Sequence, residues 1–318
     1  MLTIQKFGGS SLADAQKLRD AACDAAQKLR DGGQLVIVVS ARGSTTDALI
    51  AEAGAIDSNA GARELDALLS TGEQSSAALM AMQLSAMGIA SVSLTGQQAG
   101  IKTDLSHGDA RITGIDTCRI MRELGDGKTV VVAGFQGVNS REDITTLGRG
   151  GSDTTAVELA AALGADKCEI CSDVDGIYTA DPRLVTGARR LERIDYRDML
   201  LLARAGSQVL HSRSVEAAMK NGVEVELRSS FVKRAGTVLT RLENRPEVCG
   251  VTRDASRGSV SIVGAGVDAG LLADIAAQLA HSGIVILDTS LEPGVCTLTV
   301  SPEQLLPALE LSHALLFC

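Results

Sequence analysis

The sequence predicts an α/β fold with a mostly parallel sheet covered on both faces, followed by a second, smaller domain. Apolar, β-branched runs such as QLVIVVS at 34–40 and TVVVAGF at 129–135 alternate with helical segments, as is typical of strands buried between helix layers. The length of 318 residues is enough for about two domains of roughly 100–200 residues each. The order of elements after residue 245 then suggests a separate small sandwich.

The first 230 residues alternate strands with helices. We expect strands at 2–6, 34–40, 91–96, 129–135, 167–173 and 223–230. We expect helices at about 11–30, 46–55, 60–88, 116–124, 152–164, 195–204 and 212–221. The stretch 136–147 has the pattern of a hairpin, and 174–185 that of a long loop.

The smaller domain begins where Gly, Pro and charged residues cluster, within about 236–256. Beyond this boundary the pattern predicts strand, helix, two strands, helix and a closing strand, the βαββαβ plan of ferredoxin-like domains. The expected ranges are 258–266, 268–283, 284–290, 295–300, 302–311 and 313–318.

Composition excludes several classes of function. The net charge of −9, with Trp 0, Tyr 2 and Phe 4, argues against nucleic-acid binding, which needs a basic surface and, for single strands, aromatic platforms. The acidity also disfavours polybasic association with membranes, and no apolar run approaches the ~18–20 residues of a membrane span. The N-terminus lacks the pattern of a signal peptide, because Gly-Gly and charges follow a short apolar stretch. We therefore expect a cytoplasmic protein without nucleic-acid or membrane partners.

The seven cysteines are scattered singly, which favours reduced thiols. Cys168 and Cys171 form a CxxC pair, but they lie in a predicted strand, where alternation sends side chains three positions apart to opposite faces. Packing is therefore the preferred interpretation of this pair, rather than a redox or metal role.

The segment Lys6-Phe7-Gly8-Gly9-Ser10-Ser11 lies at the end of the first strand, before a helix. Glycines let backbone N–H groups approach an anion, and the following helix N-terminus adds favourable partial charge. A phosphate cradle is one interpretation, and a plain turn with Ser10 or Ser11 as the helix N-cap is the other. Neither a P-loop nor a dinucleotide fingerprint is present in the chain.

A second glycine-rich loop, Gly148-Arg149-Gly150-Gly151-Ser152-Asp153, also precedes a helix. Arginine binds carboxylates and phosphates in a bidentate manner, and Ser152 and Asp153 are expected at the cap. A solvated arginine in a tight turn is the alternative, but three glycines exceed what such a turn needs.

A third loop follows the strand at 167–173 and contains Ser172, Asp173, Tyr178, Asp181 and Arg183. Ligand loops in α/β sheets lie at the carboxyl ends of strands, so this loop could hold a nucleotide base and its phosphates. Its aspartates do not fit an EF-hand, because no glutamate follows at position twelve. A surface turn is the alternative.

Two further stretches are weak on their own. SARGSTTD at 40–47 follows a strand, and Glu73 lies in STGE at 70–73. Taken alone, Glu73 is best interpreted as an acid in the first turn of a helix.

Together these motifs resemble the aspartate kinases of the amino-acid kinase superfamily. The resemblance covers residues 1 to about 240 in the family's order. It is carried by KFGGSSL, VVSARGSTTDAL, LLSTGEQSSAALMAM, VVAGFQGV, ITTLGRGGSDTTAVELAAALGAD, CEICSDVDGIYTADPR and RSSF. It implies a three-layer αβα kinase domain at 1–240, an ACT-like regulatory and assembly domain at 241–318, and transfer of phosphate from MgATP to the β-carboxylate of L-aspartate. Such an enzyme would serve aspartate-pathway biosynthesis, including that of lysine and threonine.

The resemblance also implies roles for individual residues. Lys6 and Asp153 would be catalytic, with Lys6 bridging the transferred phosphate and Asp153 orienting Lys6. Aspartate would be bound by Arg149 through its α-carboxylate and by Glu73 through its ammonium, with supporting contacts from Ser40, Thr46 and Ser152. ATP would be bound by Lys6, Phe7, Gly8, Gly9, Ser172, Asp173, Tyr178, Asp181, Arg183 and Gln208. No metal ligand is assigned.

Two departures from the family pattern stand out. Gln208 occupies the place of a lysine that the family usually has near the ATP phosphates, which predicts weaker ATP binding or slower transfer. The tail has room for one ACT-like module instead of two, which predicts weak or absent feedback by lysine or threonine and a homodimer formed through that module. A kinase for another acidic amino acid and a non-catalytic ligand sensor remain the alternatives.

Overall fold

The computed structural model describes residues 1–29 and 32–317, which form two compact units. Unit 1 contains residues 1–175 and 220–235, and unit 2 contains residues 176–219 and 236–318. This division differs from the predicted boundary at 240, because residues 176–219 cluster with the C-terminal part of the chain. Residue 30, expected in the first helix, and residue 318, expected in the closing strand, lie outside the described residues.

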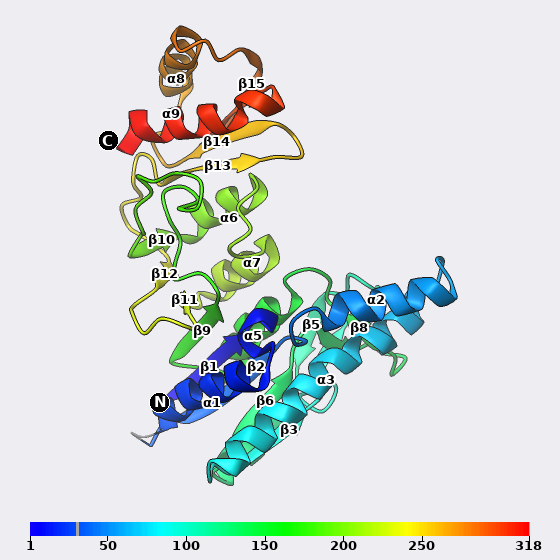
Figure 1. Cartoon of the computed structure of the whole chain (residues 1–318). Coiled ribbons are helices and arrows are strands. Elements are labelled where there is room, and N and C mark those ends of the chain that lie inside the picture. The colour runs from blue at the N-terminus through cyan, green and yellow to red at the C-terminus, as the bar shows by residue number, and fades with distance from the viewer. Residues whose placement is uncertain (30–31, 318) are drawn as a thin grey trace. The chain divides into compact units, whose positions relative to one another are not determined.

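The sheet of unit 1 is parallel, as the apolar runs predict (Figure 1). Its strands lie in the order β11-β9-β1-β2-β6-β3, and every neighbouring pair is parallel. Their bounds are β1 Leu2–Phe7, β2 Gln34–Val39, β3 Ser91–Leu94, β6 Thr129–Ala133, β9 Lys167–Ser172 and β11 Val225–Ser229. Because parallel strands all end at one edge, their following loops meet there.

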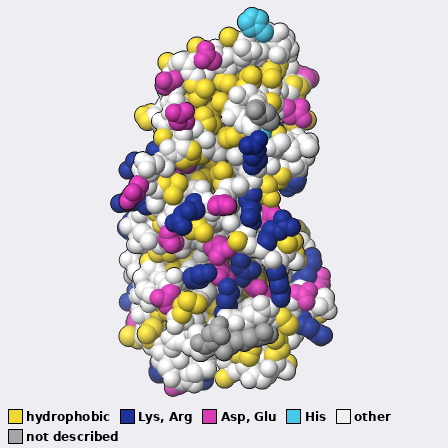
Figure 2. Space-filling model, turned by 90° about the vertical axis from the view of Figure 1, so that its left-hand side faces the viewer, with side chains coloured by type: hydrophobic (Ala, Val, Ile, Leu, Met, Phe, Trp, Pro, Cys, Tyr) yellow, Lys and Arg dark blue, Asp and Glu magenta, His cyan; other side chains and the backbone are white. Residues whose placement is uncertain are grey.

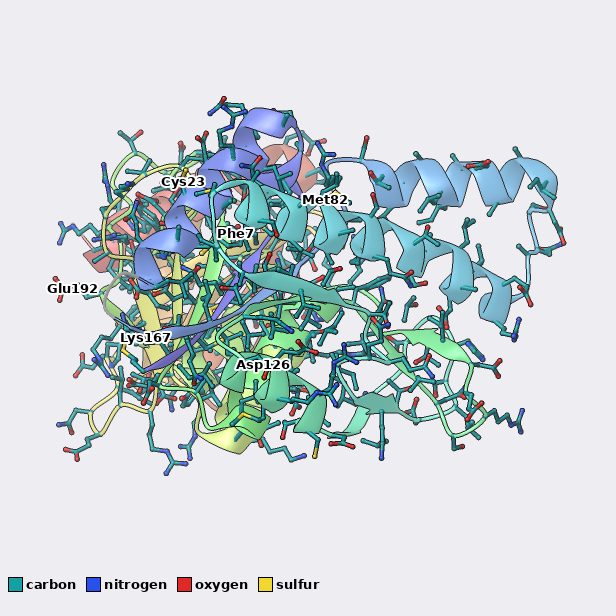
Figure 3. The ribbon with its side chains drawn as sticks, turned by 90° about the horizontal axis from the view of Figure 1, so that it is seen from below. Phe7, Cys23, Met82, Asp126, Lys167 and Glu192 are labelled. Carbon is teal, nitrogen blue, oxygen red and sulfur yellow. The ribbon has the colours of Figure 1, made fainter. Side chains whose placement is uncertain are left out.

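Helices cover both faces of this sheet. Phe7 is fully buried in one aliphatic core with residues of α1 (Ala15–Leu29) and α3 (Ala62–Ala86). Lys6, the preceding residue, points to the other face and pairs with a residue of α5 (Gly151–Leu163). Figure 3 labels Phe7 between the sheet and the helices α1 and α3, and the exposed Cys23 of α1 and Met82 of α3. This alternation sets up two different environments on adjacent residues of β1.

A second, four-stranded sheet in unit 1 has the order β5-β4-β7-β8. β7 (Gln136–Val138) and β8 (Ile144–Thr146) form the predicted antiparallel hairpin. β4 (Ile101–Thr103) and β5 (Ile112–Ile115) lie outside the strand ranges expected from the sequence. The remaining helices of this unit are η1 (Gly9–Leu12), α2 (Thr45–Ile56) and α4 (Cys118–Gly125).

Unit 2 contains a small four-stranded antiparallel sheet in the order β13-β14-β16-β15. Its strands and helices are β13 Gly250–Asp254, β14 Ser259–Val263, α8 Ala269–His281, β15 Ile286–Glu292, β16 Val295–Val300, η2 Pro302–Gln304 and α9 Leu305–Phe317. Residues of α8 and α9 share one aliphatic core with β14 and β16. The same unit contains β10 (Arg193–Asp195), which is parallel to β12 (Thr237–Thr240), together with α6 (Tyr196–Arg204). The helix α7 (Ser212–Asn221) begins in this unit as well.

The closing strand predicted at 313–318 is wrong in the part that the structure describes. Residues 305–317 continue as one helix, α9, with His313 and Leu309 buried on it. The place beside β14 belongs to β13, which precedes β14 in the chain and pairs with it antiparallel. The small domain therefore keeps the ferredoxin-like sheet, but an upstream segment supplies its fourth strand.

No helix in residues 1–29 or 32–317 combines the length and the apolarity that a membrane span requires. Figure 2 shows basic side chains interspersed with acidic ones on the face in view, rather than a continuous basic surface.

Candidate active site

Three loops meet at the carboxyl edge of the unit 1 sheet and are joined to one another by backbone hydrogen bonds. The N–H of Gly8 donates to the carbonyl of Cys171 at 3.3 Å, and that of Ser40 to Phe7 at 3.2 Å. The N–H of Gly43 donates to Gly9 at 2.9 Å. The loops after β1, β2 and β9 therefore hold one another in place before any ligand binds.

Lys6 and Asp153 form an ion pair at this edge, with 2.6 Å between Nζ and Oδ1. Only 11% of the Lys6 side chain and 14% of the Asp153 side chain are exposed. β1 supplies the lysine and the first turn of α5 supplies the aspartate. The structure thus brings together the two residues predicted to be catalytic.

The glycines after Lys6 allow a close backbone approach. A Cβ on Gly9 would lie 2.5 Å from the carbonyl oxygen of Ala41, which no side chain could tolerate. The short helix η1 has Gly8 as its N-cap and no side-chain cap bond, and the Ser11 hydroxyl instead lies 2.7 Å from that of Ser230. The alternative in which Ser10 or Ser11 caps the helix is therefore wrong.

Glu73 is buried within α3, rather than in a first helical turn as its isolated motif suggests. Its Oε1 accepts from the backbone N–H of Ala41 at 2.9 Å, and its Oε2 has no partner among the described residues. Burial raises the pKa of Glu73 to about 7, although the Ala41 N–H and the nearby charge of Lys6 both act to lower it. A buried carboxylate with one free oxygen is suited to receive a cation.

The glycine-rich loop before α5 presents Arg149 to solvent. Gly148 and Gly150 on either side have φ of 71° and 72°, a left-handed conformation that favours glycine. Arg149 makes no hydrogen bond or ion pair with any residue that the structure describes. The N-cap is Gly150, and no side chain caps the helix. Ser152 and Asp153, which were expected at the cap, are instead the second and third residues of α5. The guanidinium is thus held out on a turn of defined backbone geometry.

The predicted supporting residues occupy the same edge. Ser40 follows β2, and Thr46 lies in the first turn of α2, both partly buried. Ser152 is buried, and its Cβ lies 2.9 Å from the position of a Cβ on Gly134, the residue that follows β6. A larger residue at 134 would therefore collide with the start of α5.

The predicted ATP residues are divided between the two units. Ser172 and Asp173 lie in unit 1, with the hydroxyl of Ser172 donating to Oδ1 of Asp173 at 3.0 Å. In unit 2, Asp181 and Arg183 form a bidentate pair at 3.0 and 2.7 Å, and the hydrogen bond from Arg183 lowers the pKa of Asp181. The two other unit 2 residues are Tyr178, which bridges to Arg190 in an antiparallel manner, and the exposed Gln208.

Sequence patterns missed three contributors to this edge. The backbone N–H of Ala41 holds Glu73, but a backbone donor leaves no trace in residue identity. Phe135, two residues after the end of β6, adopts φ of 68°, a conformation that bulky residues rarely take and that marks local constraint. Asp66 on α3 is buried and accepts hydrogen bonds from the region that precedes Arg149.

The two CxxC cysteines are buried and free. Burial raises the pKa of both thiols, with a further contribution from Asp153 at Cys168. Cys171 belongs to the core shared with α1 and α3, whereas Cys168 is influenced by the side of the sheet that bears α5. The two thiols thus belong to opposite faces of β9.

A parallel sheet whose glycine-rich loops surround a partly buried lysine–aspartate pair is an architecture suited to phosphate transfer. The model of the amino acid kinase family matches residues 1–229. This match covers more than half of the chain, so the chain belongs to the amino acid kinase family.

The relatives within that family narrow the class further. The chain is 44% identical to an aspartokinase of Geobacillus stearothermophilus over 322 residues, covering 99% of this chain and 79% of the relative. It is 46% identical to aspartokinase 2 of Bacillus subtilis, covering 92% of this chain and 73% of the relative. Among solved structures, E. coli aspartokinase III in complex with aspartate and ADP is similar, with a TM-score of 0.72, 25% identity, and coverage of 95% of this chain and 79% of that one.

Proposed function

We propose that this protein is an aspartate kinase, which transfers the γ-phosphoryl group of ATP to the β-carboxylate of L-aspartate and forms 4-phospho-L-aspartate. Relatives at 44–46% identity over most of the chain are aspartokinases. The observation that carries the proposal is the placement of buried Glu73, with one free oxygen, at the sheet edge that bears the Lys6–Asp153 pair.

The chemistry suits this set of residues. An ionised carboxylate is already nucleophilic, so the enzyme needs no general base and acts by positioning and by neutralising charge. In this proposal Lys6 lies between the β- and γ-phosphates, and the N–H groups of Gly8 and Gly9 donate to phosphate oxygens. Asp153 holds the Lys6 ammonium in place through their ion pair. Lys6 then stabilises the negative charge that develops on the β-phosphate of the departing ADP.

The acceptor is recognised at both of its α-substituents. Arg149 binds the α-carboxylate in a bidentate manner, which its lack of a described partner leaves it able to do. The free Oε2 of Glu73 accepts from the α-ammonium. Ser40, Thr46 and Ser152 line the same edge and contribute hydroxyl groups. These groups select an α-amino acid. The distance from them to the γ-phosphate of ATP determines which side-chain length places the acceptor carboxylate within reach of the phosphate.

In unit 1 the proposal assigns the nucleotide to Ser172, Asp173 and the backbone of Phe7, whose side chain is fully buried. The roles of Tyr178, Asp181, Arg183 and Gln208 in unit 2 stay a prediction from the family resemblance. No group of three or more potential ligands among the described residues forms a protein metal site. Mg²⁺ prefers water and phosphate oxygens, so the ATP phosphates would hold it, and it would supply neutralisation of charge on the transferred group.

Residues 241–318 act in regulation and assembly in this proposal. β15 is an edge strand of the small sheet, and Leu287 and Leu291 on it are exposed. An edge with exposed apolar side chains favours pairing with a second copy, which supports a homodimer. Weak or absent feedback by lysine or threonine stays a prediction. The cytoplasmic location stays a prediction.

Hydroxylamine trapping of the acyl phosphate tests the proposed activity. The purified chain is incubated with MgATP and, separately, aspartate, glutamate and N-acetylglutamate, and the hydroxamate is measured. We expect hydroxamate to form with aspartate and not with glutamate or N-acetylglutamate. Product only with another acceptor would move the protein to a different substrate within the family. ATP turnover without any acyl phosphate would overturn the proposal, and repeating the assay with lysine and threonine tests the feedback prediction.

A further inference from the structure

The N-terminal half of α3 carries a buried carboxylate that the proposed reaction does not use. Asp66 is 1% exposed and lies seven residues before Glu73, two turns away on the same buried side of the helix. Figure 1 shows this half of α3 beside β8. A buried carboxylate so close to the site needs a structural or a functional explanation.

Every described partner of Asp66 belongs to the segments around the Arg149 loop. The hydroxyl of Thr146 donates to Oδ1 at 2.5 Å, and the N–H of Gly108 donates to both oxygens at 3.0 and 3.1 Å. Nδ1 of His107 lies 2.8 Å from Oδ2. Thr146 is three residues before Arg149, so a single carboxylate ties α3 to the base of the arginine loop.

The segment 107–109 also lies directly against that loop. A Cβ on Gly148 would be 2.7 Å from Oδ1 of Asp109 and 3.2 Å from the carbonyl oxygen of Gly108. Arg149 cannot fix its own loop, because its side chain has no partner among the described residues and its neighbours are glycines. On the other side, the N–H of Leu147 donates to the carbonyl of Phe135 at 2.9 Å and anchors the loop after β6.

We infer that Asp66 is a positioning residue for substrate binding: through Thr146 and Gly108 it sets the distance between Arg149 and Glu73, the two groups that read the α-carboxylate and the α-ammonium of the acceptor. This inference rests on the proposed function. α3 acts as a rigid spacer, because Glu73 and Asp66 are fixed on one helix face at a separation that the helical rise determines. Asp66 itself touches no substrate atom.

The inference predicts a selective kinetic defect. Loss of Asp66 as an anchor lets the Arg149 loop move, so the acceptor is bound less well in the ground state and the transition state alike, which raises KM and leaves kcat unchanged. We expect Asp66→Asn to raise KM for aspartate about tenfold, the effect of losing one hydrogen bond to a charged group. KM for ATP should change less than about twofold, because the Lys6 and Gly8 loops do not contact Asp66.

Further variants separate positioning from folding. Thr146→Val removes the hydroxyl and should raise KM for aspartate in the same way, whereas Thr146→Ser keeps it and should restore the parental value. The double variant Asp66→Asn with Thr146→Val should cost less than the sum of the two, because both remove one interaction. Asp104→Asn is the matched control: Asp104 accepts from the N–H groups of Ser106 and Arg111 in the same loop and does not contact Thr146.

The outcomes distinguish the two proposals. A parental enzyme that forms no aspartyl hydroxamate overturns the proposed function and this inference with it. An active parent whose Asp66→Asn variant keeps its KM for aspartate, or loses only thermal stability or only kcat, overturns this inference alone. A raised KM for aspartate with an unchanged KM for ATP in Asp66→Asn and in Thr146→Val, together with parental values in Thr146→Ser and Asp104→Asn, supports it.

Discussion

The adjacent β1 residues Gln5 and Lys6 contact charged groups on opposite faces of the sheet, and these two groups differ in how fully their charges are paired. On the face toward α1, Gln5 donates to Glu169, which also receives hydrogen bonds from Lys28 at 2.6 Å and Arg228 at 3.0 Å. Asp24 completes this cluster by accepting from Arg228. We call these five residues the α1 network. On the opposite face, Lys6 has one ionic partner, Asp153, and lies near the half-satisfied Glu73.

The two buried glutamates differ in how many of their hydrogen-bond partners the protein itself supplies. In the α1 network, burial would raise the pKa of Glu169, but the charges of Arg228 and Lys28 and the hydrogen bond from Gln5 prevail and lower it. At the site, burial prevails and raises the pKa of Glu73 to about 7. A buried charge whose partners are all supplied by the protein serves stability, whereas one left short of partners can bind a ligand. The predictions below test this contrast.

The largest effect is expected from removing the charge at the site. Lys6→Ala should lower kcat at least about 10³-fold, because it deletes the cation that stabilises the transferred phosphate. Its melting temperature should stay close to that of the parent. Lys28→Ala, which removes a lysine from the α1 network, is the matched control and should keep kcat while lowering stability. Hydroxamate assays and thermal melts of both variants measure kcat and stability. Equal losses of kcat in Lys6→Ala and Lys28→Ala would contradict the distinction between the site and the α1 network.

The second effect is on stability. Glu169→Ala leaves Arg228 and Lys28 without their buried acceptor and should lower the free energy of unfolding by about 3 kcal/mol. Because the folded-state pKa of Glu169 is lowered, its contribution is present above the unfolded pKa and is lost as the pH falls below it. Urea denaturation at pH 7 and pH 4 measures both. An unchanged midpoint at pH 7 would show that the network contributes no stability.

The third effect concerns pH and Glu73. Only the ionised carboxylate pairs with the substrate ammonium, so aspartate binding should weaken about tenfold for each pH unit below about 7. In the unliganded protein, the raised pKa means that stability falls as the pH rises from the unfolded pKa toward 7. Kinetics from pH 5.5 to 8.5 measure KM for aspartate. Glu73→Gln should bind more weakly and lose this pH dependence, and the same slope in both proteins would count against the assignment.

The smallest effect adds a charge instead of removing one. Gln208→Lys restores the cation usual in the family, and we expect a severalfold lower KM for ATP or higher kcat, as one exposed charge contributes about 0.5–1 kcal/mol. Gln208→Met, of similar length without charge, is the control. Unchanged ATP kinetics in Gln208→Lys would show that the amide causes no deficit.

Local patterns were sufficient to predict much of the fold. The parallel sheet, its helices and the β7–β8 hairpin follow from periodicity and β-branched runs, which depend on neighbouring residues. The short strands β4, β10 and β12, of three or four residues each, lie outside the predicted ranges, since so few residues show little period of their own. The final segment formed α9 instead of a strand, because β13 already occupied the sheet edge beside β14.

The sequence by itself determined the family, the glycine-rich loops and the identities of the charged residues at them, because these depend on residue type and spacing. Only the tertiary structure decided which charges are satisfied. From its local sequence Glu73 resembles an ordinary helix acid, but in the fold one of its oxygens accepts from Ala41 and the other has no hydrogen-bond partner among the described residues. No sequence pattern indicates a role for Asp66, because its partners Thr146 and Gly108 lie 80 and 42 positions away along the chain and reach it only in the fold. Hydrogen bonding and desolvation depend on such long-range neighbours, which a linear pattern does not contain.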